Sequence, residues 1–150
     1  MAALQWKYKS FEELTNSELY MIMQLRMEIF SVEQNCVYQD ADNKDFESFH
    51  LAAWDNDTLV AYCRILPPGL SFKEASIGRV ITAAVYRKSG VGRELMKRAI
   101  ETTLHQFKCR QITIGAQLYL KKFYESLGFV RISDTYLEDG IPHIEMRYTA

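Results

Sequence analysis

The stretch Arg87-Lys88-Ser89-Gly90-Val91-Gly92 decides how the middle of this chain folds. A largely apolar run over residues 77–85 precedes it, and apolar residues at helical spacing follow it over residues 95–104. The pattern predicts a buried strand, a tight glycine turn and a helix. The first amides of such a helix have no internal acceptor, and its dipole favours an anion there, while Arg87 and Lys88 add positive charge. The turn is therefore a candidate phosphate-binding site.

Hydrophobic spacing and turn residues predict the elements around this turn. Thr15 and Glu18 have the spacing of a capping box, which predicts a helix from there to about residue 33. Gly128 is placed to end a later helix. Strands are expected at residues 4–8, 49–54, 59–66, 76–84, 111–115, 129–137 and 144–148, and two more helices at residues 91–107 and 118–127. This order predicts an α/β (α+β) fold in one domain over residues 1–150, with a mixed twisted sheet of about seven strands and helices on both faces.

Composition argues against several classes of protein. The 150 residues carry a formal net charge of -1, so a nucleic-acid partner has no overall electrostatic support. Cys36, Cys63 and Cys109 are scattered without the spacing of metal ligands, and we expect them to be reduced thiols. No stretch has the apolar length of a signal peptide or of a membrane span. We therefore expect a cytoplasmic protein with no membrane and no nucleic-acid partner.

An acidic run over Asp40, Asp42, Asp45 and Glu47 raises the question of a metal site. A calcium-binding EF-hand loop that starts at Asp40 would need glycine at position 45 and glutamate at position 51, where the chain has Asp45 and Leu51. We therefore expect no bound metal. A solvated loop is the expected structure, and an acidic lip that attracts a cationic amine is the alternative.

Two familiar phosphate-binding loops do not fit the glycine turn. The P-loop requires lysine and then serine or threonine directly after its second glycine, whereas Arg93 and Glu94 follow Gly92. The dinucleotide-binding fingerprint requires a third glycine three positions later, where the chain has Leu95. On these residues alone, a simple strand-to-helix connection stays an alternative to a phosphate site.

Two segments together resemble the GNAT superfamily of acetyl-CoA-dependent N-acetyltransferases. Residues 87–92 match the family's Arg/Gln-x-x-Gly-x-Gly/Ala turn. The segment Phe123-Tyr124-Glu125-Ser126-Leu127-Gly128-Phe129 is similar to its second signature, an aromatic-rich helix that ends in Gly-Phe. The order of elements also agrees over nearly the whole chain. Within the superfamily, the chain most resembles the ElaA-type subgroup, through residues 32–36 (VEQNC), 77–80 (IGRV), 115–117 (GAQ) and 137–144 (LEDGIPHI).

The resemblance implies an acetyl-CoA site around the turn. In that family the turn amides bind the pyrophosphate of the cofactor, and the amide-rich pantetheine arm pairs with the strand before the turn. A backbone amide of that strand would also stabilise the oxyanion that forms on attack. Gln117 stands where the family commonly has an asparagine near the cofactor. The implied cofactor-binding residues are Val80, Ile81, Thr82, Arg87, Lys88, Ser89, Gly90, Val91, Gly92 and Gln117.

Acetyl transfer to an amine needs a proton donor and a proton acceptor. A lysine-like amine, with a pKa of ~10.4, must lose a proton before it attacks, and the departing thiolate benefits from a donor. Tyr124 occupies the position where the family often places that donor, with a core aromatic residue as the alternative. His143 is the candidate base because the ordinary pKa of histidine suits the task, with a structural strand residue as the alternative. Glu33, Glu138, His50 and a chain of water molecules are further candidates for the base.

Substrate binding is assigned to Arg26, Glu33 and Glu138. Arg26 falls on the apolar face of the first helix, where a charge needs a partner. Arg26 either binds substrate or forms a structural ion pair, and the sequence leaves both alternatives open. The same two alternatives apply to Arg64 on its strand.

The sequence therefore predicts an acyltransferase that moves an acetyl group from acetyl-CoA to a primary amine by direct attack in a ternary complex. The acceptor is expected to be a small molecule or a peptide. Two alternatives stay open: an enzyme like the acyl-homoserine-lactone synthases, suggested by Arg26-x-x-Ile29-Phe30, and a non-catalytic module that senses acyl-CoA. The sequence also leaves open whether the chain is a monomer or a homodimer, although exposed C-terminal strands would favour pairing.

Overall fold

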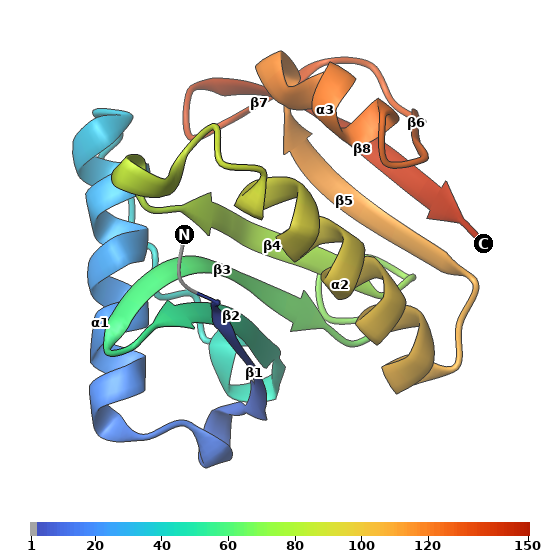
Figure 1. Ribbon diagram of the computed structural model, residues 1–150. Coiled ribbons are helices and arrows are strands. Elements are labelled where there is room, and N and C mark those ends of the chain that lie inside the picture. Colours follow the sequence, from blue (N-terminus) through green and yellow to red (C-terminus); the bar gives the residue numbers. More distant parts are fainter. Residues whose placement is uncertain (1–2) are drawn as a thin grey trace.

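Residues 3–150, which the computed structural model describes, contain eight strands in two four-stranded sheets (Figure 1). The first sheet is antiparallel, in the order β1-β2-β3-β4, and comprises β1 (Gln5–Ser10), β2 (Phe49–Asp55), β3 (Thr58–Leu66) and β4 (Ser76–Thr82). The second has the order β5-β8-β6, with β7 also paired to β8, and comprises β5 (Gln111–Gln117), β6 (Phe129–Arg131), β7 (Tyr136–Glu138) and β8 (Ile141–Thr149).

The two sheets join at one end and separate at the other. Ala75 and Ile112 form a parallel bridge, and the Thr113 amide donates to the Ala75 carbonyl over 3.0 Å. Beyond this point β4 and β5 diverge toward their carboxyl ends (Figure 1). The predicted mixed α/β fold is confirmed, but within residues 3–150 the sheet is split into two halves with eight strands instead of about seven.

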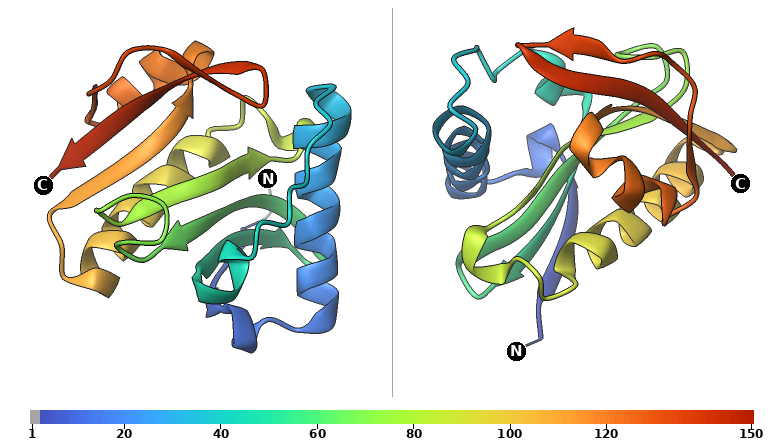
Figure 2. Two further views of the ribbon diagram at one scale, coloured as in Figure 1. Left: turned by 180° about the vertical axis from the view of Figure 1, so that it is seen from behind. Right: turned by 90° about the horizontal axis from the view of Figure 1, so that it is seen from above.

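Helices cover both faces of the first sheet, as predicted (Figure 2). α1 (Asn16–Arg26) lies on one face and continues into the π-helical segment η2 (Met27–Glu33). α2 (Val91–Phe107) lies on the other face, and α3 (Lys121–Glu125) packs against the second sheet on the same side as α2. Short 3₁₀ turns are η1 (Phe11–Glu13), η3 (Lys44–Glu47), η4 (Ala84–Tyr86) and η5 (Leu118–Leu120). In the described part of the chain, no helix has the length and apolar character needed to span a bilayer.

Alternation along the strands determines which helix each side chain meets. Leu51 and Ala53 of β2 belong to the apolar cluster that packs against α2. Their neighbours Ala52 and Trp54 point to the opposite face and belong to the cluster that packs against α1. The central strands are therefore buried on both faces, which explains why β3 reads as an almost continuous apolar run.

The start of α1 follows the sequence closely, whereas its end does not. The Glu18 amide donates to Thr15 Oγ1 over 3.0 Å, and the Thr15 amide donates to Glu18 Oε1 over 2.9 Å, so the predicted capping box is confirmed. The helical run extends to Glu33, as expected, but its last seven residues are π-helical. A π-helical segment changes which residues share a face, and such segments are frequent at functional sites.

The C-terminal strands differ from the prediction in two places. Residues 129–137 were expected to form one strand, but β6 ends at Arg131 and β7 begins at Tyr136. The Ser133 hydroxyl accepts a hydrogen bond from the Glu145 amide over 2.8 Å, so a side chain takes the place of a main-chain partner there. Asp139 and Gly140 have φ of 51° and 77°, the pattern of a two-residue hairpin turn, and β8 therefore begins at Ile141.

Candidate active site

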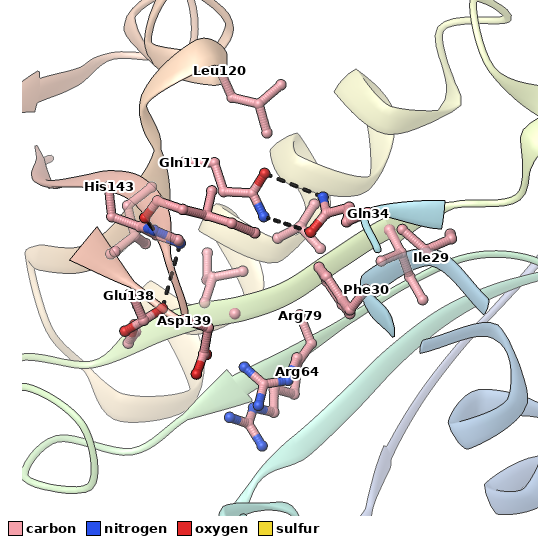
Figure 3. Close-up of a pocket in the computed structure, with 18 of the residues that line it drawn as sticks. Ile29, Phe30, Gln34, Arg64, Arg79, Gln117, Leu120, Glu138, Asp139 and His143 are labelled. Atoms are coloured by element: carbon pink, nitrogen blue, oxygen red, sulfur yellow. Dashed lines mark hydrogen bonds and ion pairs between the residues drawn. The ribbon is translucent and has the colours of Figure 1, made fainter. Parts of the chain in front are cut away.

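A cavity of about 1190 Å³ opens where β4 and β5 diverge (Figure 3). Its walls come from β4, the end of β5, the β7–β8 hairpin, η2 with the residues after it, and the start of α2. Predicted site residues that line it are Glu33, Val80, Ile81, Thr82, Arg87, Gly92, Gln117, Tyr124, Glu138 and His143. The remaining predicted residues are placed elsewhere: Lys88, Ser89 and Gly90 in the exposed turn between Arg87 and Gly92, and Val91 and Arg26 in the interior.

A bulge in β4 accounts for the divergence of the sheets. Tyr62 pairs with Ile81 and Arg64 pairs with Gly78, so Arg79 and Val80 together stand opposite one residue of β3. Arg79 has a φ of 51°, which is uncommon for a residue with a side chain. Such a bulge bends its strand and interrupts the ladder. β4 is an outer strand of the first sheet, so the edge that faces the cavity is free of strand partners over residues 80–82.

The glycine turn has the backbone geometry of an anion-binding loop. Lys88 and Gly90 have positive φ, 66° and 89°, and Gly90 is the residue from which α2 begins. Alternating backbone conformations of this kind direct successive amides into one concave surface at the positive end of a helix. A Cβ atom on Gly92 would lie 3.4 Å from Thr82 Oγ1, which is an ordinary contact. The fold therefore tolerates a small side chain at position 92, which lines the cavity.

Arg87 and Glu33, predicted to bind cofactor and substrate, bind each other. Arg87 Nη1 donates to Glu33 Oε1 over 2.6 Å, and Arg87 Nη2 donates to Glu33 Oε2 over 2.9 Å. The pair joins the glycine turn to η2, and both residues line the cavity. Hydrogen bonds from Arg87 lower the pKa of the Glu33 carboxyl, which makes this residue a weaker base than an ordinary glutamate.

Tyr124 places a phenol in the wall of the cavity. Its ring lies at the start of a packed aromatic row, edge-on to Phe123 at 5.2 Å and to Phe129 at 5.8 Å between ring centroids. The residue is 6% exposed, and among residues 3–150 its hydroxyl has no hydrogen-bond partner. Burial raises the pKa of Tyr124 well above its ordinary value, so the phenol keeps its proton near neutral pH. A protonated phenol in the cavity wall has the chemistry of a hydrogen-bond or proton donor.

His143 and Glu138 form the end of the cavity at the β7–β8 hairpin (Figure 3). His143 Nδ1 lies 2.7 Å from the Ile141 carbonyl oxygen, which assigns the proton of a neutral imidazole to Nδ1. His143 Nε2 lies 3.4 Å from Glu138 Oε2 and then carries a free lone pair, as a general base requires. Gln117 stands directly opposite His143 in the β5–β8 ladder.

His50, another candidate base, lies outside this cavity. The residue is 1% exposed, and its ring nitrogens contact the Tyr62 hydroxyl at 2.7 Å and the Asp45 carbonyl oxygen at 3.1 Å. Burial lowers the pKa of His50, since the charged imidazole is disfavoured in the interior. These contacts indicate that His50 has a structural role in the protein interior.

The acidic run was expected to be a solvated loop, and that expectation is wrong. Asp40 and Asp45 are buried against the guanidinium group of Arg26. Arg26 Nε donates to Asp40 Oδ2 over 2.8 Å, and Arg26 Nη1 donates to Asp45 Oδ1 over 2.7 Å. Arg26 is fully buried and does not line the cavity in the described part of the chain. The contacts therefore support the structural ion pair for Arg26 and not a contact with substrate.

Arg64 and Arg79 extend this ion-pair network to the cavity wall (Figure 3). Arg64 forms two hydrogen bonds with Asp42, at 2.6 and 2.8 Å, and Arg79 Nε donates to Asp40 Oδ1 over 2.7 Å. Burial would raise the pKa of Asp42, but the hydrogen bonds and charge of Arg64 outweigh it and lower that pKa. The network fixes the loop after η2 against β3 and the β4 bulge.

Sequence reasoning missed two residues that contact other walls of the cavity, Gln34 and Cys36. The side-chain amides of Gln34 and Gln117 form two hydrogen bonds, each 3.2 Å long. Cys36 Sγ donates to the Asp139 carbonyl over 3.3 Å. Both missed residues belong to the stretch 32–36, which carries part of the subgroup resemblance, so the signal was present without an assigned role.

Comparisons with known proteins agree with this geometry. The family model described as an acetyltransferase (GNAT) domain matches residues 22–150. Protein ElaA of Escherichia coli strain K12 is 43% identical over 145 residues, which cover 95% of each chain. A crystal structure of an acyl-CoA N-acyltransferase from Pseudomonas aeruginosa has a TM-score of 0.93 and 40% identity, and the match covers 98% of this chain and 100% of that one. The crystal structure of Escherichia coli ElaA gives a TM-score of 0.91 and 41% identity, over 97% of this chain and 99% of ElaA.

The chain belongs to the GNAT family of acetyltransferases and is similar to ElaA within that family.

Proposed function

We propose that this protein transfers an acetyl group from acetyl-CoA to a primary amine by direct attack in a ternary complex. One observation carries the proposal: a single cavity contains the free edge of β4, the start of α2, Tyr124 and His143. The name of the Pseudomonas aeruginosa relative, an acyl-CoA N-acyltransferase, supports the same class of reaction.

In the proposed complex, acetyl-CoA lies between the two sheets. Its pyrophosphate binds the amides of residues 88–92, because the positive φ angles and the start of α2 favour an anion there. Its pantetheine arm lies along Val80, Ile81 and Thr82, as an extra strand would on an unpaired sheet edge. This arrangement directs the thioester toward Tyr124.

The acceptor amine binds at the β7–β8 end of the cavity. Glu138, Asp139 and Glu145 line that end, and within residues 3–150 no lysine or arginine forms an ion pair with them. Uncompensated carboxylates raise the local concentration of a cationic ligand. They would therefore attract an ammonium group from solution and bring it close to His143.

Each proton in the proposed reaction has a place to go. His143 Nε2, or water next to it, accepts a proton from the ammonium group, and the free amine nitrogen attacks the thioester carbonyl carbon. Tyr124 then donates its proton to the sulfur as the carbon–sulfur bond breaks. The attacking nitrogen releases its second surplus proton, which returns to the Tyr124 phenolate directly or through water, and His143 or the water next to it passes the first proton to solvent. The products are an acetylated amine and coenzyme A with a free thiol.

A thiol-release assay with pooled amines tests the proposal. Purified protein, acetyl-CoA and pools of polyamines, aminoglycosides, amino acids and lysine peptides should give release of free coenzyme A that depends on the amine pool. Tight binding of acetyl-CoA without turnover on any pool would support the sensor alternative. Preference for longer acyl chains, with consumption of S-adenosylmethionine, would support the synthase alternative.

Replacement of Gly92 should separate cofactor binding from folding. Leucine at this position would project into the cavity beside Thr82, and we expect it to raise the Kd for coenzyme A by about ten-fold or more. Alanine is the matched control: its Cβ atom fits at 3.4 Å from Thr82 Oγ1, and it stabilises the helix by about 1 kcal/mol relative to glycine. Isothermal titration calorimetry measures the affinities. Equal affinities of the leucine and alanine variants would exclude this end of the cavity as the phosphate site.

A further inference from the structure

Residues 27–36, here called the strap, follow α1 and contribute to one wall of the cavity, where Figure 3 labels Ile29, Phe30 and Gln34. The strap contacts three different walls through three polar side chains within four positions of the chain. Glu33 pairs with Arg87 of the glycine turn, Gln34 pairs with Gln117 at the end of β5, and Cys36 Sγ donates to the main chain of the β7–β8 turn. The strap is therefore attached to both halves of the divided sheet.

The contact between Gln34 and Gln117 differs from the other two because it is reciprocal. Gln34 Nε2 donates to Gln117 Oε1, and Gln117 Nε2 donates to Gln34 Oε1, both over 3.2 Å (Figure 3). Each primary amide has two N–H groups and one carbonyl oxygen with two lone pairs. The pair uses one N–H and one lone pair of each amide, so each amide keeps one donor and one acceptor site for a ligand. Both side chains are half-buried and line the cavity.

The orientation of Gln117 depends on this pairing. A glutamine side chain has several rotatable bonds and loses that freedom only when a partner holds it. Among residues 3–150, the Gln34 amide is the hydrogen-bond partner of the Gln117 side chain. The two stretches that carry the subgroup resemblance, residues 32–36 and 115–117, meet in this contact. The side chain of Gln117 is longer than the asparagine that is common at this position, and its amide reaches Gln34 of the strap.

We propose that Gln34 is a positioning residue, which fixes the Gln117 amide so that it can bind the pantetheine arm of coenzyme A. The inference rests on the proposed function. The pantetheine arm presents amide N–H and C=O groups, and the Gln117 amide, when it is paired with Gln34, keeps one donor and one acceptor for them. Gln34 acts through Gln117, because without Gln34 the Gln117 side chain would sample other rotamers before binding.

Coenzyme A affinity in single and double variants tests this role. Calorimetry on the full chain would compare wild type, Gln34→Ala, Gln117→Ala and the double variant. We expect either single substitution to raise the Kd for coenzyme A by about ten-fold, the effect of one well-oriented hydrogen bond. We expect the double variant to bind like Gln117→Ala, because Gln34 has no further role once Gln117 is gone. In turnover, Gln34→Ala should raise the KM for acetyl-CoA and leave the KM for the amine unchanged.

Two controls separate positioning from a general effect on the fold. Gln24→Ala removes an exposed glutamine from α1 and should leave the Kd for coenzyme A unchanged. The contacts of Glu33 and Cys36 do not involve Gln34, so the strap stays attached in Gln34→Ala, and its thermal unfolding without ligand should match that of Gln24→Ala.

Three results would overturn the inference. If Gln34→Ala bound coenzyme A as tightly as wild type while Gln117→Ala bound it weakly, Gln117 would not need Gln34 to hold its orientation. A double variant whose loss equals the product of the two single losses would show that Gln34 acts independently. A wild-type protein that does not bind coenzyme A would overturn the proposed function as well, which distinguishes that failure from the other two.

Discussion

Tyr124→Phe is expected to lower kcat for acetyl transfer by about 100-fold or more, because it removes the donor that protonates the departing thiolate. The phenol lies in the cavity wall, and its raised pKa keeps it protonated over the pH range of an ordinary assay. The wild-type rate should therefore show no loss from deprotonation of Tyr124 as the pH rises from neutral to about 9. Steady-state kinetics with the best amine from the pooled assay would measure both effects.

The folded state should tolerate this substitution. In the described residues the Tyr124 hydroxyl has no protein partner, so phenylalanine leaves no buried group unsatisfied and keeps the aromatic packing with Phe123 and Phe129. The Kd for coenzyme A and the melting temperature are expected to stay at wild-type values. Tyr20→Phe, which changes an exposed tyrosine on α1, is the matched control and should leave kcat unchanged.

A change of leaving group gives a sharper test of the same role. An acetyl thioester of a more acidic thiol needs less help from a proton donor, so the penalty of Tyr124→Phe should shrink with that substrate. A penalty of equal size with both thioesters would mean that Tyr124 positions the substrate instead of donating a proton. A kcat within about three-fold of wild type would remove Tyr124 from the mechanism.

Arg26→Ala is expected to lower the free energy of unfolding by about 3–5 kcal/mol, the largest stability effect that we predict. The guanidinium group of Arg26 is the shared partner of Asp40 and Asp45, and all three groups are buried. Its removal leaves carboxylates in the interior without full compensation. Urea unfolding at neutral pH would measure the change in free energy.

An exposed arginine serves as the control for Arg26. Arg98 pairs with Glu94 on the surface of α2 and stacks on Trp6, so Arg98→Ala should cost about 1 kcal/mol or less. If Arg26→Ala were no more destabilising than Arg98→Ala, the buried ion pairs of Arg26 with Asp40 and Asp45 would not make the expected large contribution to stability.

The same network should make the protein sensitive to acid. Burial raises the pKa of Asp45, but the hydrogen bond and charge of Arg26 outweigh it, so the folded-state pKa lies below the unfolded value. A lowered pKa of this kind adds stability that is fully present above the unfolded pKa of about 4 and is lost as the pH falls through the folded value. In Arg26→Ala only Arg64 still lowers the Asp45 pKa, so its folded value lies closer to the unfolded one. The urea midpoint of this variant should therefore fall less as the pH is lowered below about 4 than the wild-type midpoint does.

Local signals in the sequence were sufficient for the elements that depend on neighbouring residues. The capping box of Thr15 and Glu18, the helix stop at Gly128 and the two-fold alternation along β2 involve contacts within a few positions of each other. Chain geometry alone relates such residues, so spacing predicted them. The glycine turn was predictable for the same reason, since a strand, a turn and a helix start within a few residues.

Contacts between distant parts of the chain were not predictable in this way. The acidic run looked solvated because charged residues usually face water, and nothing near it in sequence indicated three arginines from α1, β3 and β4. Arg87 looked free to bind phosphate, although Glu33, 54 positions away, holds it. The π-helical end of α1 was missed because apolar spacing does not record a change in helical hydrogen bonding.

Local spacing and motifs were enough to establish the family, the order of the elements and the residues of the glycine turn. The separation of β4 and β5, the buried ion-pair network of the acidic loop and the contact between the Gln34 and Gln117 amides, which are 83 positions apart, became known from the folded structure. Such contacts depend on the packing of whole sheets and helices, which brings charges and amides together regardless of their distance along the chain.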